Sequence, residues 1–109
     1  MSDNFTTKVV SILKNIPKGK VVTYGQVASI AGKPNGARQI SWILNSLSEK
    51  EDLPWHRVVN SFGKISLPEG FGFGKQLYRL KNEGIKFDDK NRIDLKRFLW
   101  AYDKIENEY

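Results

Sequence analysis

The sequence contains no cysteine and only one histidine, His56, among its 109 residues. Without cysteine the chain can form no disulfide, no thiolate nucleophile and no cysteine-ligated metal site. One histidine cannot build a zinc centre alone. These two shortages exclude redox chemistry and most metal chemistry, so we expect no cofactor and no metal.

Long apolar runs are also missing. None approaches the roughly 20 residues that span a bilayer, and the N-terminus Met-Ser-Asp-Asn-Phe lacks the basic and apolar regions of a signal peptide. A content of 39% hydrophobic and 28% charged residues is ordinary for a soluble protein. We therefore expect one domain over residues 1–109, cytoplasmic, intracellular and monomeric, with no membrane partner.

Acidic residues are absent from residues 4–48, and this segment carries the whole excess of positive charge. Its basic residues account for the net charge of +6, because acids and bases balance in the rest of the chain. A surface with one sign of charge attracts polyanions and releases counterions from a phosphate backbone. A nucleic-acid partner is expected, with a solvated basic face as the alternative. The basic residues are Lys8, Lys14, Lys18, Lys20, Lys33 and Arg38.

Residues 5–16 have the apolar spacing of an amphipathic helix. Ser2, Asp3 or Asn4 can cap its N-terminus, and Pro17 ends the pattern. We expect this helix to contribute one face to the core. Its apolar positions are Phe5, Val9, Ile12, Leu13 and Ile16.

Two further helices are expected within the acid-free segment. Thr23 and Gln26 have the spacing of a capping box, so a helix should begin there and stop at Gly32. Asn35 is a plausible N-cap for the next helix, whose apolar residues at 40, 43, 44 and 47 share one face. Two short helices joined by a tight turn form a helix-turn-helix pattern, which is common in DNA-binding domains.

The stretch 53–60 reads Leu-Pro-Trp-His-Arg-Val-Val-Asn and concentrates the unusual residues of the chain. Pro54 fixes the backbone before Trp55 and His56, and Val58-Val59 favours a strand, so the pair should sit at a rigid corner. Such a corner can present Trp55 to a ligand, or Trp55 can plug the core. The local pattern leaves both interpretations open.

The second half of the chain predicts short hairpins and helices. Residues 58–59 and 64–65 flank turn residues and predict a hairpin that resembles a wing. We then expect a glycine-rich loop over 66–74 and a helix around Leu77 and Leu80 that is closed by Gly84. A hairpin over 85–93 and a helix over 95–102 should follow, with Trp100 half-buried on the flank of that helix. The expected fold class is mainly α with small β-hairpins, a winged helix-turn-helix domain.

Four ordered motifs carry a resemblance to a known family. They are Gly-Lys-Val-Val-Thr-Tyr-Gly-Gln-Val-Ala at 19–28, Ala-Arg-Gln at 37–39, Pro-Trp-His-Arg-Val-Val-Asn at 54–60 and Asn-Glu-Gly at 82–84. Together they resemble the C-terminal domain of the O6-alkylguanine-DNA alkyltransferases over most of the chain. The resemblance is closest to the alkyltransferase-like proteins, in which the reactive cysteine of Pro-Cys-His-Arg is replaced, often by tryptophan as at Trp55.

The resemblance implies a site without its nucleophile. In the transferases a cysteine thiolate, activated through a histidine and a glutamate, takes the alkyl group from a flipped guanine; the last two positions match His56 and Glu83. An indole is no comparable nucleophile, so the positions Trp55, His56 and Glu83 are expected to be vestigial and the protein inactive as an alkyltransferase. His56 is then expected to hold the corner rigid through its ring hydrogen bonds.

The DNA-binding residues transfer to this chain by the same resemblance. Arg38 matches the arginine finger that enters the base stack, where its plane can stack and stay charged. Tyr24 matches the tyrosine that crowds the phosphate and helps rotate the nucleotide out. Ala37 and Ser41, small and one turn apart, fit a recognition helix that lies close in the minor groove. The alternative is an ordinary surface arginine and a half-buried tyrosine.

The resemblance also implies a lesion pocket lined by Leu44, Trp55 and the main chain near Val58. The loop over 66–74 aligns with the lid of that pocket, although Pro68 and Glu69 depart from the family pattern. The expected function is binding of O6-alkylguanine in duplex DNA by nucleotide flipping without alkyl transfer, which flags the lesion for nucleotide excision repair proteins. The alternative is a sequence-specific winged-helix transcription regulator, which has no need of the Arg38 finger or the Trp55 corner.

Overall fold

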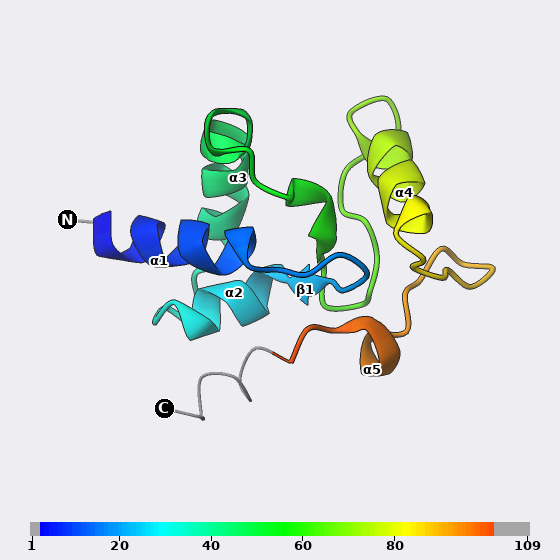
Figure 1. Ribbon diagram of the computed structural model, residues 1–109, viewed down its shortest axis with the longest axis horizontal. Helices are drawn as coiled ribbons and strands as arrows, with labels where there is room; N and C mark the ends of the chain where they lie inside the picture. The colour runs from blue at the N-terminus through cyan, green and yellow to red at the C-terminus, as the bar shows by residue number, and fades with distance from the viewer. Residues whose placement is uncertain (1–2, 102–109) are drawn as a thin grey trace.

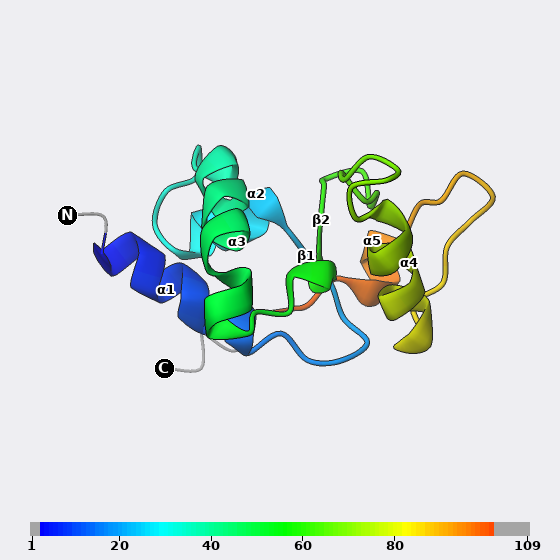
Figure 2. The same ribbon diagram turned by 90° about the horizontal axis from the view of Figure 1, so that it is seen from above.

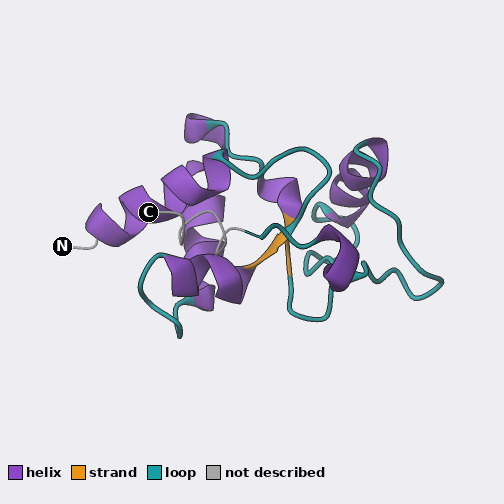
Figure 3. Cartoon of the chain, turned by 60° about the horizontal axis from the view of Figure 1, so that its bottom comes forward, coloured by secondary structure: helices purple, strands orange, loops and turns teal. Residues whose placement is uncertain are grey.

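The computed structural model describes residues 3–101, and residues 1–2 and 102–109 are not described. The described chain is mainly helical, with one two-stranded sheet between a larger helical group and a smaller one (Figures 1 and 3). This confirms the expected mainly α class. No described helix is long and apolar enough to cross a membrane. The elements are α1 Asp3–Lys14, β1 Val22–Thr23, α2 Tyr24–Ile30, α3 Ala37–Glu51, a 3₁₀ turn Trp55–Arg57, β2 Val58–Val59, α4 Phe73–Asn82 and α5 Leu95–Phe98.

The larger helical group consists of α1, α2 and α3, which pack their apolar stripes together. The expected stripe of α1 is buried over its whole length, although the helix itself ends at Lys14 rather than Ile16. The amides of Asn15 and Ile16 continue with tighter bonds to carbonyls three residues back. The N-cap expected at Ser2, Asp3 or Asn4 is not settled, because Ser2 lies outside the described residues and the other two lie within the helix.

The helix-turn-helix is present in α2 and α3. Thr23 Oγ1 accepts from the amide of Gln26 at 3.0 Å, and Gln26 Oε1 accepts from the amide of Thr23 at 3.3 Å, which is the expected capping box. Gly32 follows α2 at φ +104°, a backbone conformation that favours glycine. The N-cap of α3 is Gly36 rather than the expected Asn35, and no side chain caps that end.

The sheet differs from the expected wing. Val58 and Val59 pair in parallel with Val22 and Thr23, not in a hairpin with residues 64 and 65. A tight turn does form, because the amide of Asn60 donates to the carbonyl of Lys64 at 2.9 Å. The chain then diverges, since the carbonyl of Gly63 accepts from the amide of Ile93 at 2.8 Å. This contact with a distant segment replaces the ladder that a hairpin needs.

The smaller group packs α4 and α5 around a second core. Gly84 closes α4 at φ +90°, and the amide of Ile85 donates to the carbonyl of Leu80, as in a Schellman motif. The second expected hairpin is reduced to one antiparallel bridge between Phe87 and Ile93. The core residues are Val21, Val59, Ile65, Leu80, Ile85, Ile93 and Phe98.

The C-terminal helix is shorter than the expected span of 95–102. It ends at Phe98, because the chain becomes extended and runs parallel to Val21. The amide of Val21 donates to the carbonyl of Phe98, and the amide of Trp100 donates to the carbonyl of Val21. Trp100 is therefore buried in the larger core instead of half-buried on a helix flank, and Tyr102 lies outside the described residues.

Candidate nucleic-acid interface

The corner at Trp55 connects α3 to the sheet. Asp52 ends α3 in the left-handed conformation, and Pro54 precedes one 3₁₀ turn over Trp55–Arg57 that leads directly into β2. The turn buries His56 and leaves Trp55 half-buried, with the two rings edge to face at 6.1 Å. The corner expected from the sequence is therefore present.

Glu83, from the end of α4, ties the corner to the smaller group. Its Oε2 lies 2.8 Å from Nε2 of His56 and 2.7 Å from Nη2 of Arg57. Nε of Arg57 also donates to Oε1 at 3.0 Å, and the amide of Gly19 donates to the same oxygen at 3.2 Å. The carboxylate thus collects donors from two segments that are distant from it in sequence, and it is almost fully buried.

The pKa values of both His56 and Glu83 are lowered in this buried cluster. Burial alone raises the pKa of Glu83, but the hydrogen bonds from Arg57, His56 and Gly19 outweigh it and lower the pKa to about 2. Burial lowers the pKa of His56, and this outweighs the opposing effect of Glu83. Glu83 is therefore ionised and His56 neutral near pH 7, so the Nε2–H of His56 donates to Glu83.

Acid should destabilise this protein in two steps. His56 takes up a proton less readily in the folded chain than in the unfolded chain, so stability should begin to fall below about pH 6.5. Glu83 has its pKa depressed from 4.5 to about 2, so its contribution should be lost progressively between those values. Urea unfolding measured from pH 7 to pH 2 checks this.

The variant His56→Gln separates the two steps. It should remove the decline near pH 6 while the decline below pH 4.5 remains. If the free energy of unfolding stays constant from pH 7 to pH 3, the pKa values of His56 and Glu83 are not lowered by folding.

Gln76 on α4 holds the backbone of the corner and was not singled out in the sequence. Its side chain is buried, and Nε2 donates to the carbonyls of His56 and Val58, both at 3.0 Å. Its position one turn before Leu80 was the only sequence signal. His56 Nδ1 is buried without a partner among the described residues. The corner is thus held by the Nε2 contact of His56 with Glu83 and by the two bonds from Gln76.

A cavity of about 650 Å³ opens between α3, the corner, α4 and the loop 66–74. Four residues expected at the DNA interface or lesion pocket line it, namely Tyr24, Ser41, Leu44 and Trp55. Val58 does not line it, because its side chain is fully buried and its carbonyl is bound to Gln76. Residues 66–74, over which a lid was expected, contribute Ser66, Leu67 and Phe71 to its lining.

A cation that sequence reasoning missed lies in this cavity. Arg79 projects from α4, and its Cζ is 5.5 Å from the centroid of the Trp55 ring. A guanidinium over an indole face is a cation–π contact, which fixes both side chains. The corner and α4 therefore form one wall together. The sequence separates these residues by a loop and gave no signal of their contact.

The other expected DNA-binding residues lie along α3 and at its approach. Arg38 is exposed near the start of the helix, one residue after the half-buried Ala37, and makes no hydrogen bond or ion pair within residues 3–101. Tyr24 is half-buried at the start of α2, where its hydroxyl accepts from Ser66 Oγ at 3.4 Å. Figure 2 shows α3 on the near side of the larger group, with the chain crossing from it to β2.

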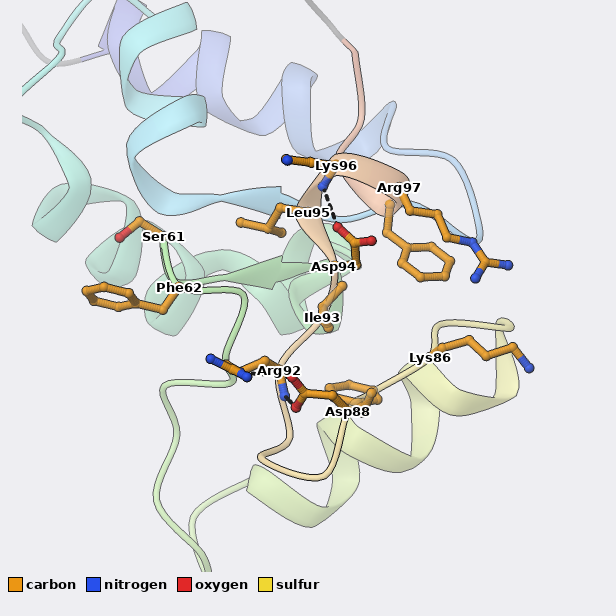
Figure 4. A pocket seen from close by; sticks show the side chains of 12 residues that line it. Ser61, Phe62, Lys86, Asp88, Arg92, Ile93, Asp94, Leu95, Lys96 and Arg97 are labelled. Carbon is orange, nitrogen blue, oxygen red and sulfur yellow. Dashed lines mark hydrogen bonds and ion pairs between the residues drawn. The ribbon is translucent and has the colours of Figure 1, made fainter.

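A second hollow lies between the turn at Ser61 and Phe62, the 86–94 segment and α5 (Figure 4). The two carboxylates that line it accept hydrogen bonds from nearby backbone amides. Asp88 accepts from the amides of Lys90 and Arg92, and Asp94 accepts from the amide of Lys96. No residue lines both hollows. Over the described residues, no three His, Asp or Glu side chains are grouped as a metal site would require.

Comparisons with known proteins agree with this geometry. Residues 4–85 match the family model of the 6-O-methylguanine DNA methyltransferase, DNA binding domain. The chain is 45% identical over 100 residues to the DNA base-flipping protein of Escherichia coli, covering 92% of this chain and 77% of that protein. It is 37% identical over 103 residues to alkyltransferase-like protein 1 of Schizosaccharomyces pombe, covering 90% and 95%.

A solved structure supports the same assignment. The crystal structure of S. pombe Atl1 in complex with damaged DNA containing O6-carboxymethylguanine matches with a TM-score of 0.79 and 36% identity, covering 91% of this chain and 96% of that one. The mostly helical fold with a short parallel pair of strands is thus shared with that protein. On sequence and fold together, the chain belongs to the family of the 6-O-methylguanine DNA methyltransferase DNA-binding domain and is similar to its alkyltransferase-like members.

Proposed function

We propose that this protein binds O6-alkylguanine in duplex DNA, turns the damaged nucleotide into the cavity beside Trp55 and holds it without alkyl transfer. One observation carries the proposal: Ser41 and Leu44 on α3 line the same cavity as Trp55. A helix docked on DNA through this face would place the cavity beside the duplex. The cavity also has the volume range of ordinary small-molecule pockets.

The acid-free segment supplies the attraction for the phosphate backbone, and α3 lies within it up to Ser48. Ala37 and Ser41 are small, so the helix can approach the floor of the minor groove. Minor-groove contacts carry little sequence information. Flipping costs a few kcal/mol of unstacking, and less for a poorly paired base. Selectivity for lesions thus arises partly before any contact in the cavity.

The absence of a nucleophile leads us to propose binding without reaction. The chain has no cysteine, and Trp55 occupies the corner beside the ionised Glu83 and the neutral His56. In the alkyltransferases that the chain resembles, this pair would activate a thiolate. Here its contacts with Arg57 and Gly19 give it a structural role. A bound lesion would persist, and we propose that it is passed to nucleotide excision repair proteins.

A matched pair of duplexes tests the binding step. Affinity is measured at one salt concentration for duplexes that differ only in one O6-methylguanine, because phosphate contacts depend strongly on salt. We expect tighter binding to the damaged duplex. Equal affinities would refute the proposed function and favour a general DNA-binding role.

A labelled methyl group on the same oligonucleotide tests the absence of transfer. We expect the label to stay on the DNA after long incubation with excess protein. Label recovered on the protein would overturn the claim of inactivity while leaving the binding claim intact.

A further inference from the structure

Trp42 is an exposed indole on α3 that lies outside the four sequence motifs and does not line the cavity beside Trp55. It lies on α3, and 61% of its surface is accessible. It makes no hydrogen bond or ring contact with the part of the chain that the structure describes. Large aromatic side chains gain most from burial, so an indole left open on a binding helix is a candidate contact.

The position of Trp42 on α3 associates it with Arg38. The two residues are four apart, so their side chains lie on the same face of the helix, one above the other. Neighbouring Ser41 lines the cavity, whereas Trp42 does not. Trp42 therefore stands outside the lesion pocket but beside the residues proposed to enter the groove.

The charge of the segment that holds Trp42 favours a polyanion such as DNA as its partner. The segment 4–48 holds no acidic residue, and the first acid on α3 is Glu49, which lies on the same side of the helix as Trp42 but about two turns further along it. In Figure 1 this helix extends above α1 and α2. An exposed aromatic ring one helical turn from an exposed arginine is typical of nucleic-acid binding, where the ring contacts bases and sugars and the cation contacts phosphates.

We propose that Trp42 is a second DNA contact on α3, which packs its indole against the sugars and base edges of the groove next to Arg38 and stabilises the complex with or without a lesion. This inference rests on the proposed docking of α3 on DNA. It differs from the proposed function because Trp42 contributes to affinity for every duplex, whereas the cavity contributes to lesion preference.

The variant Trp42→Ala tests the contact on the damaged and undamaged duplexes described above. We expect both affinities to fall by a similar factor, roughly tenfold, which is within the range of one aromatic stack. The ratio of the two affinities and the slope of affinity against salt should not change, because an indole carries no charge. Trp42→Phe should recover part of the loss.

A matched control comes from Tyr78→Ala. Tyr78 is similarly exposed, at 68%, but it lies on α4 and does not line the cavity. We expect this variant to bind both duplexes as the wild type does. An equal loss in both variants would mean that any exposed aromatic matters, and it would overturn the assignment of Trp42.

Fluorescence gives a second, independent measurement. Trp42 is the most exposed of the three tryptophans, because Trp55 is half-buried and Trp100 is buried. The difference in iodide quenching of tryptophan fluorescence between the wild type and Trp42→Phe therefore measures the exposure of Trp42. We expect undamaged duplex to protect this signal. Unchanged quenching together with unchanged affinity in Trp42→Ala would refute the contact.

The outcomes separate this inference from the proposed function. If the protein prefers the damaged duplex and Trp42→Ala binds both duplexes as the wild type does, only the Trp42 contact is refuted. Loss of binding to both duplexes in a protein without lesion preference refutes the lesion-binding function but supports the contact. A loss confined to the damaged duplex would place Trp42 in lesion recognition and overturn its general role.

Discussion

Replacing Glu83 with glutamine is expected to lower the free energy of unfolding by about 3–5 kcal/mol, the usual cost of removing one partner from a buried ion pair. The amide cannot neutralise Arg57, whose guanidinium would remain largely buried beside a neutral partner. It would also weaken the bonds from His56 and from the amide of Gly19. Urea unfolding at pH 7 measures the change.

An exposed ion pair provides the control for Glu83→Gln. Lys14 and Glu51 are 3.1 Å apart, but both side chains are well exposed. The variant Lys14→Ala should therefore lose less than about 1 kcal/mol. If Glu83→Gln and Lys14→Ala are equally mild, the buried cluster does not hold the two halves of the protein together.

A double variant distinguishes the effect of an unpaired buried charge from the effect of lost side-chain packing. Arg57→Met combined with Glu83→Gln removes both charges while keeping most of the volume. We expect the double variant to be more stable than Glu83→Gln alone, because no unpaired charge remains buried. Arg57 also donates to the carbonyl of Ile16, so recovery should be incomplete.

The helices of the larger group were predictable because their signals are local. The spacing of Phe5, Val9 and Ile12 and the capping box of Thr23 and Gln26 involve residues within one or two turns. Such patterns indicate a helix from nearby residues alone, although packing of its apolar face supplies most of its stability. The helix-turn-helix therefore followed from the sequence alone.

The sheet was mispredicted because its pairing is not local. Val58-Val59 has the composition of a strand, and the nearest partner in sequence suggested a hairpin. In the structure its partner is Val22-Thr23, more than thirty residues away. The same applies to the last helix, which is cut short because Trp100 pairs with Val21. No local pattern encodes these contacts.

The candidate site divides in the same way. Trp55, His56 and Glu83 were singled out through ordered motifs; Nε2 of His56 lies 2.8 Å from Oε2 of Glu83, and the Trp55 ring is edge to face with the His56 ring. Gln76 and Arg79 were missed because each acts through a partner brought close by folding, a carbonyl in one case and an indole face in the other. A polar residue on a helix is usually exposed, so nothing marked Gln76 as buried.

Replacing Arg38 with alanine should reduce affinity for the damaged duplex by roughly ten- to a hundredfold. In the proposed complex its guanidinium occupies the gap left by the flipped base, where stacking of this kind is worth about 1–3 kcal/mol. Arg38 is exposed and makes no hydrogen bond or ion pair within the described residues, so its removal should leave the fold intact. The loss on the undamaged duplex should be smaller, because flipping is less frequent there.

Two further variants separate stacking from charge. Arg38→Lys keeps the charge but not the plane, so it should preserve the salt dependence while still losing most of the lesion preference. Lys90→Ala removes one charge from an exposed loop outside the acid-free segment and should leave the preference unchanged. If Arg38→Lys binds the damaged duplex as tightly as the wild type, Arg38 acts only as a charge, and the gap-filling role proposed for it is wrong.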